Sequence, residues 1–272
     1  MLGENGRQAG LIVPRRKALG MVMGAAAVAA GGTLLSACGG ITIPGAVETT
    51  GGSTLTSSTA NPKTASTMVA ATSAGVNLVA SGTDINNMAD DFTYYFVQNR
   101  GPGTWSCKVN RQPAVPGDGG YALAGLLARA DGTPDCAEIG LFCTDGQGVI
   151  LRWRDAAGQQ MNQWPRPIAL GVAAPIYLQM SLARGTNAFS VSYSTNGTAW
   201  AEEGISTSMS FAGDTFLIGL AACAHSATGY AVDQFTDIQG FGKKKFYYLD
   251  VAATSPSSSA KTPSGKSGGK AS

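Results

Sequence analysis

The titratable residues of this chain do not form a recognisable catalytic set. Glycoside hydrolysis needs two carboxyl groups facing each other across the scissile bond, one to donate a proton and one to attack or activate water. Glu138 stands alone in its expected strand, Asp135 precedes that strand on no shared face, and Glu202 and Glu203 are adjacent and so point in opposite directions. A Ser-His-Asp triad would depend on His225, the only histidine, and no G-x-S-x-G turn lies between residues 82 and 241. The sequence therefore predicts that the chain is not an enzyme.

The sequence does contain residues of the types that bind sugars. A sugar needs an aromatic ring against its apolar face and planar amide, carboxylate or guanidinium groups for its hydroxyls. The candidate ligand-binding residues are Trp164, Tyr177, Arg152, Arg154 and Gln179. Trp164 lies in an expected loop, and a tryptophan exposed in a loop indicates a binding role. Packing over the edge of the fold is the alternative.

The sequence contains few candidate residues for a metal or cofactor site. Zinc binding is not expected, because no C-x-x-C spacing occurs and there is a single histidine. Calcium prefers clustered oxygen ligands, for which Asp84, Asn86, Asp90 and Asp91 are the candidates. No other cofactor is predicted.

Four cysteines follow the first one at position 38. Cys107, Cys136, Cys143 and Cys223 are an even number, which in an oxidising compartment suits two disulfides. If residues 136–144 form one strand, Cys136 and Cys143 lie too far apart to bridge each other. Buried free thiols acting as small hydrophobic groups are the alternative.

Short apolar runs separated by turn residues must position these side chains. Turns such as Asp145-Gly146 and Asn196-Gly197 recur every ten to fifteen residues, and helical periodicity is absent outside the N-terminal segment. Strands are expected near 93–98, 104–111, 121–130, 136–144, 148–154, 176–183, 187–194, 215–223 and 231–239. This pattern predicts an all-β fold, a two-sheet antiparallel sandwich.

Alternation within the strands predicts one packed and one polar face. Phe189, Val191 and Tyr193 oppose three serines, and Tyr177 and Gln179 oppose leucine and methionine. A polar sheet face with aromatic residues can offer a groove to a polar ligand, but a half-solvated antiparallel sheet has the same pattern.

Several segments in order resemble the concanavalin A-like lectin/glucanase superfamily. They are residues 90–92, 124–129, 137–144, 149–154, 177–187, 194–200 and 216–225. The similarity is greatest to the small sandwich appended to secreted carbohydrate-active proteins, and it covers about residues 82–241. The resemblance implies a jelly-roll sandwich and a non-catalytic, carbohydrate-binding module, with a polysaccharide or glycoconjugate as partner.

The N-terminal segment predicts export and lipid attachment. Arg15 and Arg16 precede a weakly apolar stretch and resemble a twin-arginine signal, with an ordinary secretion signal as the alternative. Residues 35–38 (LSAC) resemble a bacterial lipobox, which makes Cys38 the predicted lipidation site. The expected location is therefore the bacterial cell envelope, on a membrane through a lipid anchor, and the outer membrane or the periplasm-facing side is favoured over the cytoplasm.

Composition divides the chain into four parts. They are a signal peptide (1–37), a Thr/Ser/Gly-rich tether (38–81), the sandwich (82–252) and a disordered basic tail (253–272). Residues 82–241 carry eight Lys/Arg against fourteen Asp/Glu, a net charge of −6, which argues against nucleic-acid binding. A structural or protein-interaction envelope lipoprotein is the alternative function, and a divergent glycoside hydrolase is a third.

Overall fold

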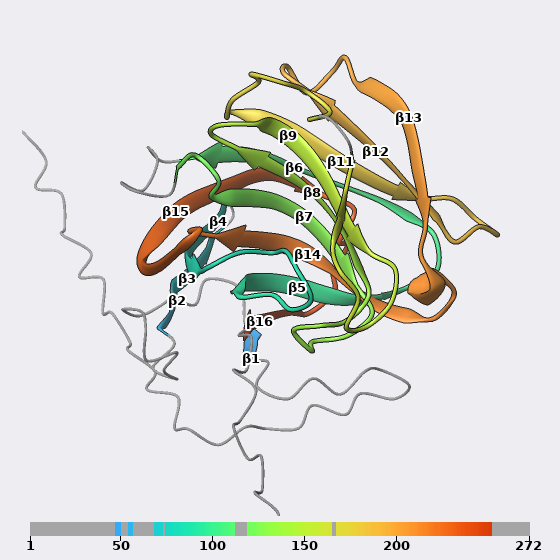
Figure 1. Cartoon of the computed structure of the whole chain (residues 1–272), viewed down its shortest axis with the longest axis horizontal. Coiled ribbons are helices and arrows are strands. Elements are labelled where there is room, and N and C mark those ends of the chain that lie inside the picture. Colours follow the sequence, from blue (N-terminus) through green and yellow to red (C-terminus); the bar gives the residue numbers. More distant parts are fainter. Residues whose placement is uncertain are drawn as a thin grey trace, which may run out of the picture.

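The computed structural model describes residues 47–49, 54–56, 68–72, 74–111, 119–164 and 167–251. Within these residues the chain forms two eight-stranded antiparallel sheets that lie one over the other (Figure 1). We name them sheet A and sheet B. No α-helix occurs in this described part, which holds one short 3-10 helix, Ser210–Gly213.

Sheet A carries most of the buried strands. Its order is β1 (Val47–Thr49), β16 (Phe246–Val251), β5 (Phe92–Arg100), β14 (Thr215–Cys223), β7 (Leu123–Arg129), β8 (Glu138–Thr144), β9 (Gly148–Arg154) and β10 (Asn162–Gln163). The order in sheet B is β13 (Ala201–Ser208), β12 (Ala188–Ser194), β11 (Ile176–Leu182), β6 (Gly103–Arg111), β15 (Ser226–Gln239), β4 (Gly75–Gly82), β3 (Met68–Thr72) and β2 (Thr54–Thr56).

The chain passes repeatedly from one sheet to the other. Strands β5, β6 and β7 alternate between sheets A, B and A, and β14, β15 and β16 do the same. The two crossings lie side by side, because β5 pairs with β14 and β6 pairs with β15. This arrangement confirms the two-sheet antiparallel jelly-roll sandwich expected from the sequence.

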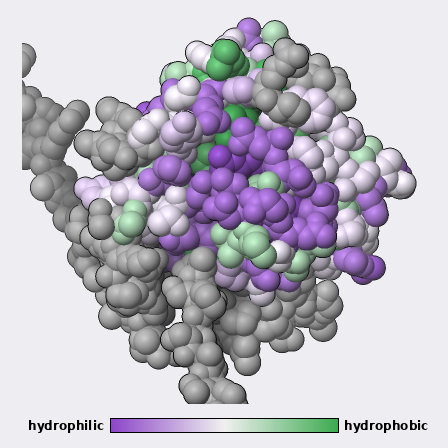
Figure 2. All heavy atoms as spheres, viewed as in Figure 1, coloured by the Kyte–Doolittle hydropathy of each residue, from purple (hydrophilic) through white to green (hydrophobic). Residues whose placement is uncertain are grey.

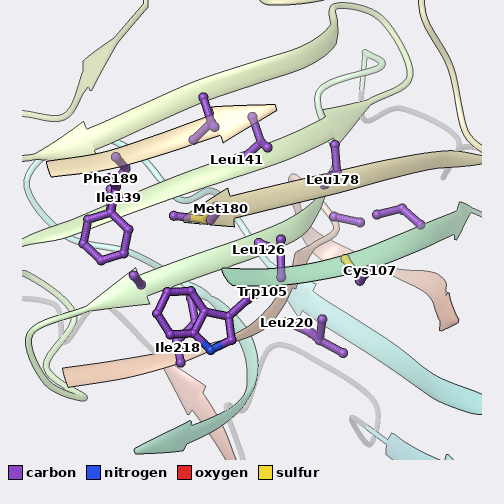
Figure 3. Packing of buried hydrophobic residues seen from close by; sticks show 14 of the residues in the cluster. Trp105, Cys107, Leu126, Ile139, Leu141, Leu178, Met180, Phe189, Ile218 and Leu220 are labelled. Carbon is purple, nitrogen blue, oxygen red and sulfur yellow. The ribbon is translucent and has the colours of Figure 1, made fainter. Parts of the chain in front are cut away.

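The main hydrophobic core fills the space between the sheets. Its centre is shown in Figure 3, where the labelled residues of sheet A are Leu126, Ile139, Leu141, Ile218 and Leu220, and those of sheet B are Trp105, Cys107, Leu178, Met180 and Phe189. These side chains alternate along their strands, and in β11 every second residue is buried. The period of two that predicts a strand therefore also builds this core.

The outer faces of the two sheets differ. On sheet B the outer face is polar and partly exposed, with Ser190, Ser181 and Thr104 in register across β12, β11 and β6. On sheet A the outer face is covered and holds a second hydrophobic cluster, which includes Leu127 and Phe142. The expectation of one polar face is thus right for β11 and β12. In residues 148–154 the same alternation predicts a polar face of Ile150, Arg152 and Arg154, and this is wrong, because that face of β9 is buried. The face of the molecule in Figure 2 is mainly hydrophilic, with hydrophobic residues in a few small groups.

All nine expected strands are present, and the sequence pattern misses several others. Strand β16 completes the centre of sheet A, and β4 places Val76, Leu78 and Ala80 in the main core. The sandwich therefore begins before residue 82, within the segment expected to be a tether.

The disulfide expectation is wrong in this structure. Cys107, Cys136, Cys143 and Cys223 are all free and buried, as the alternative of small hydrophobic thiols describes. Burial raises the pKa of the Cys143 thiol to about 11, and it also raises the pKa values of the other three. A thiol with a raised pKa is a poor nucleophile at neutral pH.

Candidate functional site

A crossing segment covers the outer face of sheet A and brings polar groups onto it. Residues 83–91, which we name the strap, connect β4 to β5. Near the two ends of the strap, the Asp91 N–H donates to the Asp84 carbonyl at 2.9 Å. In the middle of the strap, the Asn87 carbonyl accepts from the Met161 N–H at 2.9 Å. Ile85 is fully buried in the second hydrophobic cluster. The strap is therefore a packed layer of the fold.

Four buried charged side chains lie beneath the strap. Arg129, Glu138 and Arg154 are direct neighbours across β7, β8 and β9, and Asp90 of the strap lies over them. Asp90 accepts hydrogen bonds from the Arg154 guanidinium at 2.6 and 3.0 Å, and its Oδ2 lies 3.3 Å from Arg129 Nη2. The Glu138 carboxylate lies 3.2 Å from Arg129 and 3.4 Å from Arg154, in ion pairs without hydrogen-bond geometry.

Burial dominates the electrostatics of Glu138. Removal from water raises the pKa of its carboxyl group to about 8, and the neighbouring Asp90 acts in the same direction, whereas Arg129 and Arg154 oppose the shift. The side chain is 1% exposed. A general acid must reach the substrate, so the present arrangement suits the attachment of the strap better than proton transfer to a ligand.

A second polar group lies at the beginning of the strap and is partly exposed. Asp84 Oδ1 accepts a hydrogen bond from Arg152 Nη1 at 2.9 Å, and Asp84 Oδ2 lies 3.7 Å from His225 Nε2. The ring of Tyr121 lies 5.4 Å from the His225 ring, centroid to centroid. We name Tyr121, His225, Asp84 and Arg152 the strap corner.

Local backbone structure explains why these four residues meet. Leu123 on β7 pairs with Cys223 on β14, so Tyr121 and His225 occupy facing positions just beyond the two strand ends. His225 has φ of 51°, a left-handed conformation that turns the chain out of β14. Arg152 extends from the outer face of β9 and is oriented by Gln163, whose Oε1 accepts from its Nε at 2.9 Å.

The strap corner has the composition that sugar recognition requires. Tyr121 is 44% exposed, and the side chains of His225 and Asp84 are 34% and 18% exposed. An aromatic plate therefore lies beside an imidazole and a carboxylate, which can bond to hydroxyls. The Arg152 side chain is 7% exposed and orients the carboxylate from below.

The structure does not bring the five predicted ligand-binding residues together. Arg152 and Arg154 share the outer face of sheet A, but Arg154 is fully buried in its ion pairs. Tyr177 and Gln179 lie on the outer face of sheet B. Trp164 follows β10 at the edge of sheet A, where its backbone N–H donates to the Leu151 carbonyl, and its side chain is exposed, at 39% for the residue.

Tyr177 and Gln179 already have partners within the protein. A Cβ added to Gly197 would lie 2.9 Å from the Tyr177 ring, so the β12–β13 turn rests on that ring, and Lys108 Nζ lies 5.5 Å from its centroid. Gln179 Oε1 accepts from the Ser192 hydroxyl at 3.3 Å. These contacts leave the strap corner with the more accessible aromatic ring.

The candidate calcium ligands are divided among other partners. Asp84 and Asp90 face arginines, and Asp91 Oδ2 accepts from Thr83. Among the described residues no group of three or more His, Cys, Asp or Glu side chains is arranged to hold a metal ion.

The predicted export and lipidation residues, Arg15, Arg16 and Cys38, lie outside the described residues. Where the structure is described, no helix is both long and apolar enough to cross a membrane.

Fold and site together define a jelly-roll β-sandwich with a partly exposed polar and aromatic corner. No protein-family model matches the chain, and no curated protein matches it. Among solved structures, a functionally unknown protein from Saccharomyces cerevisiae is 14% identical, with a TM-score of 0.49, over 69% of this chain and 94% of that one. The GH43 protein BlXynB of Bacillus licheniformis is 14% identical, with a TM-score of 0.43, over 65% of this chain and 33% of that one.

A lectin domain is also among the similar structures. The exoplasmic/lumenal domain of VIP36, in a form bound to calcium and a mannose-containing glycan, is 7% identical, with a TM-score of 0.35, over 69% of this chain and 83% of that one. All these TM-scores are below 0.5, so the likenesses assign neither a family nor an activity to this chain.

Proposed function

We propose that this protein is a non-catalytic carbohydrate-binding lipoprotein of the bacterial cell envelope, with the strap corner as its ligand site. The observation that carries the proposal is the exposed Tyr121 ring beside His225 and Asp84. The ring offers an apolar plate to a sugar face, and the carboxylate and imidazole accept or donate hydrogen bonds at its rim.

The surroundings keep this corner in a fixed geometry. Asp84 Oδ1 also accepts from the Ile85 N–H at 2.8 Å, and Arg152 Nη1 donates to the Ile85 carbonyl at 2.9 Å. Because Ile85 is anchored in the second hydrophobic cluster, the carboxylate is oriented before a ligand arrives. Preorganised polar groups lose less conformational entropy on binding.

The location in the envelope is supported by the sequence. Arg15 and Arg16 precede the apolar stretch, and the lipobox follows it, which is the order of an exported lipoprotein. Lipid on Cys38 would hold the sandwich at a membrane surface, where it can meet polysaccharide or glycoconjugate. Mass spectrometry of the protein purified from membranes tests the lipid directly.

A glycan array tests the ligand site, using the chain from Gly39 onward with calcium and with a chelator. We expect saturable binding to one class of glycan. Tyr121→Ala should weaken that binding on the order of tenfold through loss of the stacking surface. Tyr177→Ala is the matched control, because Tyr177 lies on the outer face of β11, which β6 and β15 separate from β4 and the strap.

Two outcomes would count against the proposal. A blank array from folded protein would favour the protein-interaction alternative. Binding that survives Tyr121→Ala and is lost in Trp164→Ala would move the ligand site to the edge of sheet A, because Trp164 follows the edge strand β10.

A further inference from the structure

Two groups of positive side chains among the described residues have different surroundings. Each of the four arginines that contact the buried or half-buried interior pairs with a carboxylate; they are Arg111, Arg129, Arg152 and Arg154. A second group, Arg100 with Lys243, Lys244 and Lys245, is exposed at one end of the sandwich. We name this second group the basic corner.

Sheet pairing places the basic corner together. Strand β5 ends at Arg100, and the loop carrying the three lysines enters β16, which pairs with β5 through Tyr247 and Phe96. The antiparallel register continues into the loop, where Lys244 Nζ contacts the side-chain oxygen of Asn99. Residues 143 positions and more apart in sequence thus form one surface.

Three members of the basic corner form no ion pair with an acidic side chain that the structure describes. Arg100, Lys243 and Lys244 form no ion pair with any described carboxylate, and the contact of Lys244 is to a neutral amide. Partial burial lowers the pKa of the Lys244 amine. Asp214, which precedes the register partner of Arg100, is the nearest acidic residue along β14. Glu48 of β1 is also close along the strands, because it pairs with Tyr247. The four basic residues of the corner therefore outnumber the two neighbouring acidic residues, on a body that is otherwise acidic.

We propose that the basic corner binds the headgroups of anionic lipids in a bilayer. The choice of a bilayer rests on the proposed lipid attachment at Cys38. Strand β1 begins nine residues after Cys38, and Thr49 at its end pairs with Phe246, directly after Lys245. Nine residues span at most about 30 Å, so a lipid on Cys38 holds the basic corner within reach of the membrane surface.

The expected strength follows from surface electrostatics. Each basic residue near an anionic membrane contributes about fivefold in affinity, so loss of three lysines should weaken binding on the order of one hundredfold. The effect should diminish as salt rises, because exposed charges are screened beyond about 8 Å at physiological ionic strength.

Vesicle sedimentation tests the proposal with the chain from Gly39 onward, which carries every described residue and no lipid. The probes are vesicles of phosphatidylcholine alone and of phosphatidylcholine mixed with phosphatidylglycerol. We expect binding to the mixed vesicles only, and its loss in the triple variant Lys243→Ala, Lys244→Ala and Lys245→Ala. The control is Lys108→Ala, compared with the single variant Lys243→Ala, because each removes one positive charge and Lys108 lies within β6, paired with Tyr177.

Several results would overturn the proposal. They are no binding to the mixed vesicles, equal loss in the triple and control variants, or binding to dextran sulfate without binding to vesicles, which would indicate a soluble polyanion. If the triple variant does not fold, Arg100→Ala alone should still weaken vesicle binding about fivefold. Failure here is distinct from failure of the anchor, because mass spectrometry reports the lipid on Cys38 separately.

Discussion

Single buried charges hold the strap onto sheet A. Asp90 is fully buried and is shared by Arg129 and Arg154, which come from two different strands. Loss of the carboxylate partner would destabilise the fold, because each arginine would then be a buried charge with neither hydration nor an ion pair. Asp90 thereby ties the strap to two strands of sheet A, in addition to the contacts of Asn87 and Ile85.

Removal of Asp90 should be costly. Asp90→Ala leaves two buried guanidinium groups with Glu138 as their remaining carboxylate, and we expect a loss of about 3–5 kcal/mol in the free energy of unfolding. Urea unfolding measures it. Asp214→Ala, at an exposed site, is the control and should change stability by less than about 0.5 kcal/mol. A loss as small as in the control would mean that Asp90 does not hold the strap.

A buried carboxyl group at the other end of the sandwich predicts a pH dependence. Asp233 is fully buried, its Oδ1 lies 3.4 Å from Arg111 Nε, and neither carboxylate oxygen has a hydrogen-bond partner among the described residues. Burial raises the pKa of Asp233 from 3.8 to about 7, although Arg111 acts in the opposite direction. The folded protein therefore binds this proton more tightly than the unfolded chain does.

The sign of the effect follows from that difference. Between pH 4 and 7 the unfolded chain releases the proton while the folded protein keeps it, so stability contributed by Asp233 is present at low pH and is lost as pH rises. Asp233→Asn should remove up to about 4 kcal/mol of this pH dependence, seen in urea unfolding from pH 4 to 8. An unchanged slope in the variant would contradict the assignment.

At the scale of strands, close approach in sheet A depends on glycine. A Cβ built on Gly125 of β7 would lie 2.0 Å from the Leu141 carbonyl oxygen of β8. Because backbone atoms cannot move aside as a flexible side chain can, the two strands would have to separate. Gly125 therefore sets the geometry of the β7–β8 pair.

Gly125→Ala should destabilise the protein by about 1–3 kcal/mol through overpacking, measured by urea unfolding. Gly213→Ala is the matched control, because the nearest atom to its added Cβ is 3.7 Å away and its φ is not positive. Equal stability of the two variants would show that sheet A relaxes around the extra methyl group.

Elements with strong alternation were predictable from sequence, and those with other patterns were not. Strands β11 and β12 alternate and were found with the correct faces. In β7 every residue is buried, because its outer face packs in the second hydrophobic cluster and Arg129 lies under Asp90 of the strap. These contacts come from distant segments, so the local pattern of β7 does not predict them. Strand β4 was missed because it follows a Thr/Ser/Ala-rich stretch that sets the composition of the whole region.

The ligand site was less predictable than the fold. Tyr121 and His225 meet because Leu123 pairs with Cys223, a register between strands that lie a hundred residues apart. Residue types alone make Arg152 a ligand-binding candidate, and the structure places it in the strap corner, where it is 6% exposed. They also group it with Tyr177, which belongs to the other sheet. Sequence provides the chemistry of each side chain, whereas the crossing of the strap decides which of them meet.

For the whole molecule, the position of β4 sets where the chain can be shortened. A chain that begins at residue 82 lacks Val76, Leu78 and Ala80 and exposes an edge of β15. We expect it to aggregate or to remain unfolded, whereas a chain that begins at residue 74 keeps β4 and folds. Circular dichroism and gel filtration distinguish them. A monomeric, cooperatively folded chain from residue 82 would contradict this view of the core.

The four free thiols are distributed so that they can report separately on the layers of the molecule. Cys107 and Cys143 belong to the core between the sheets, whereas Cys223 belongs to the cluster under the strap and Cys136 contacts Arg129 beside it. An alkylating reagent would therefore modify Cys136 and Cys223 first if the strap lifts while the sheets stay together. Simultaneous modification of all four would mean that the strap, sheet A and sheet B open as one cooperative unit. The rates of thiol modification therefore report the order in which these layers unfold.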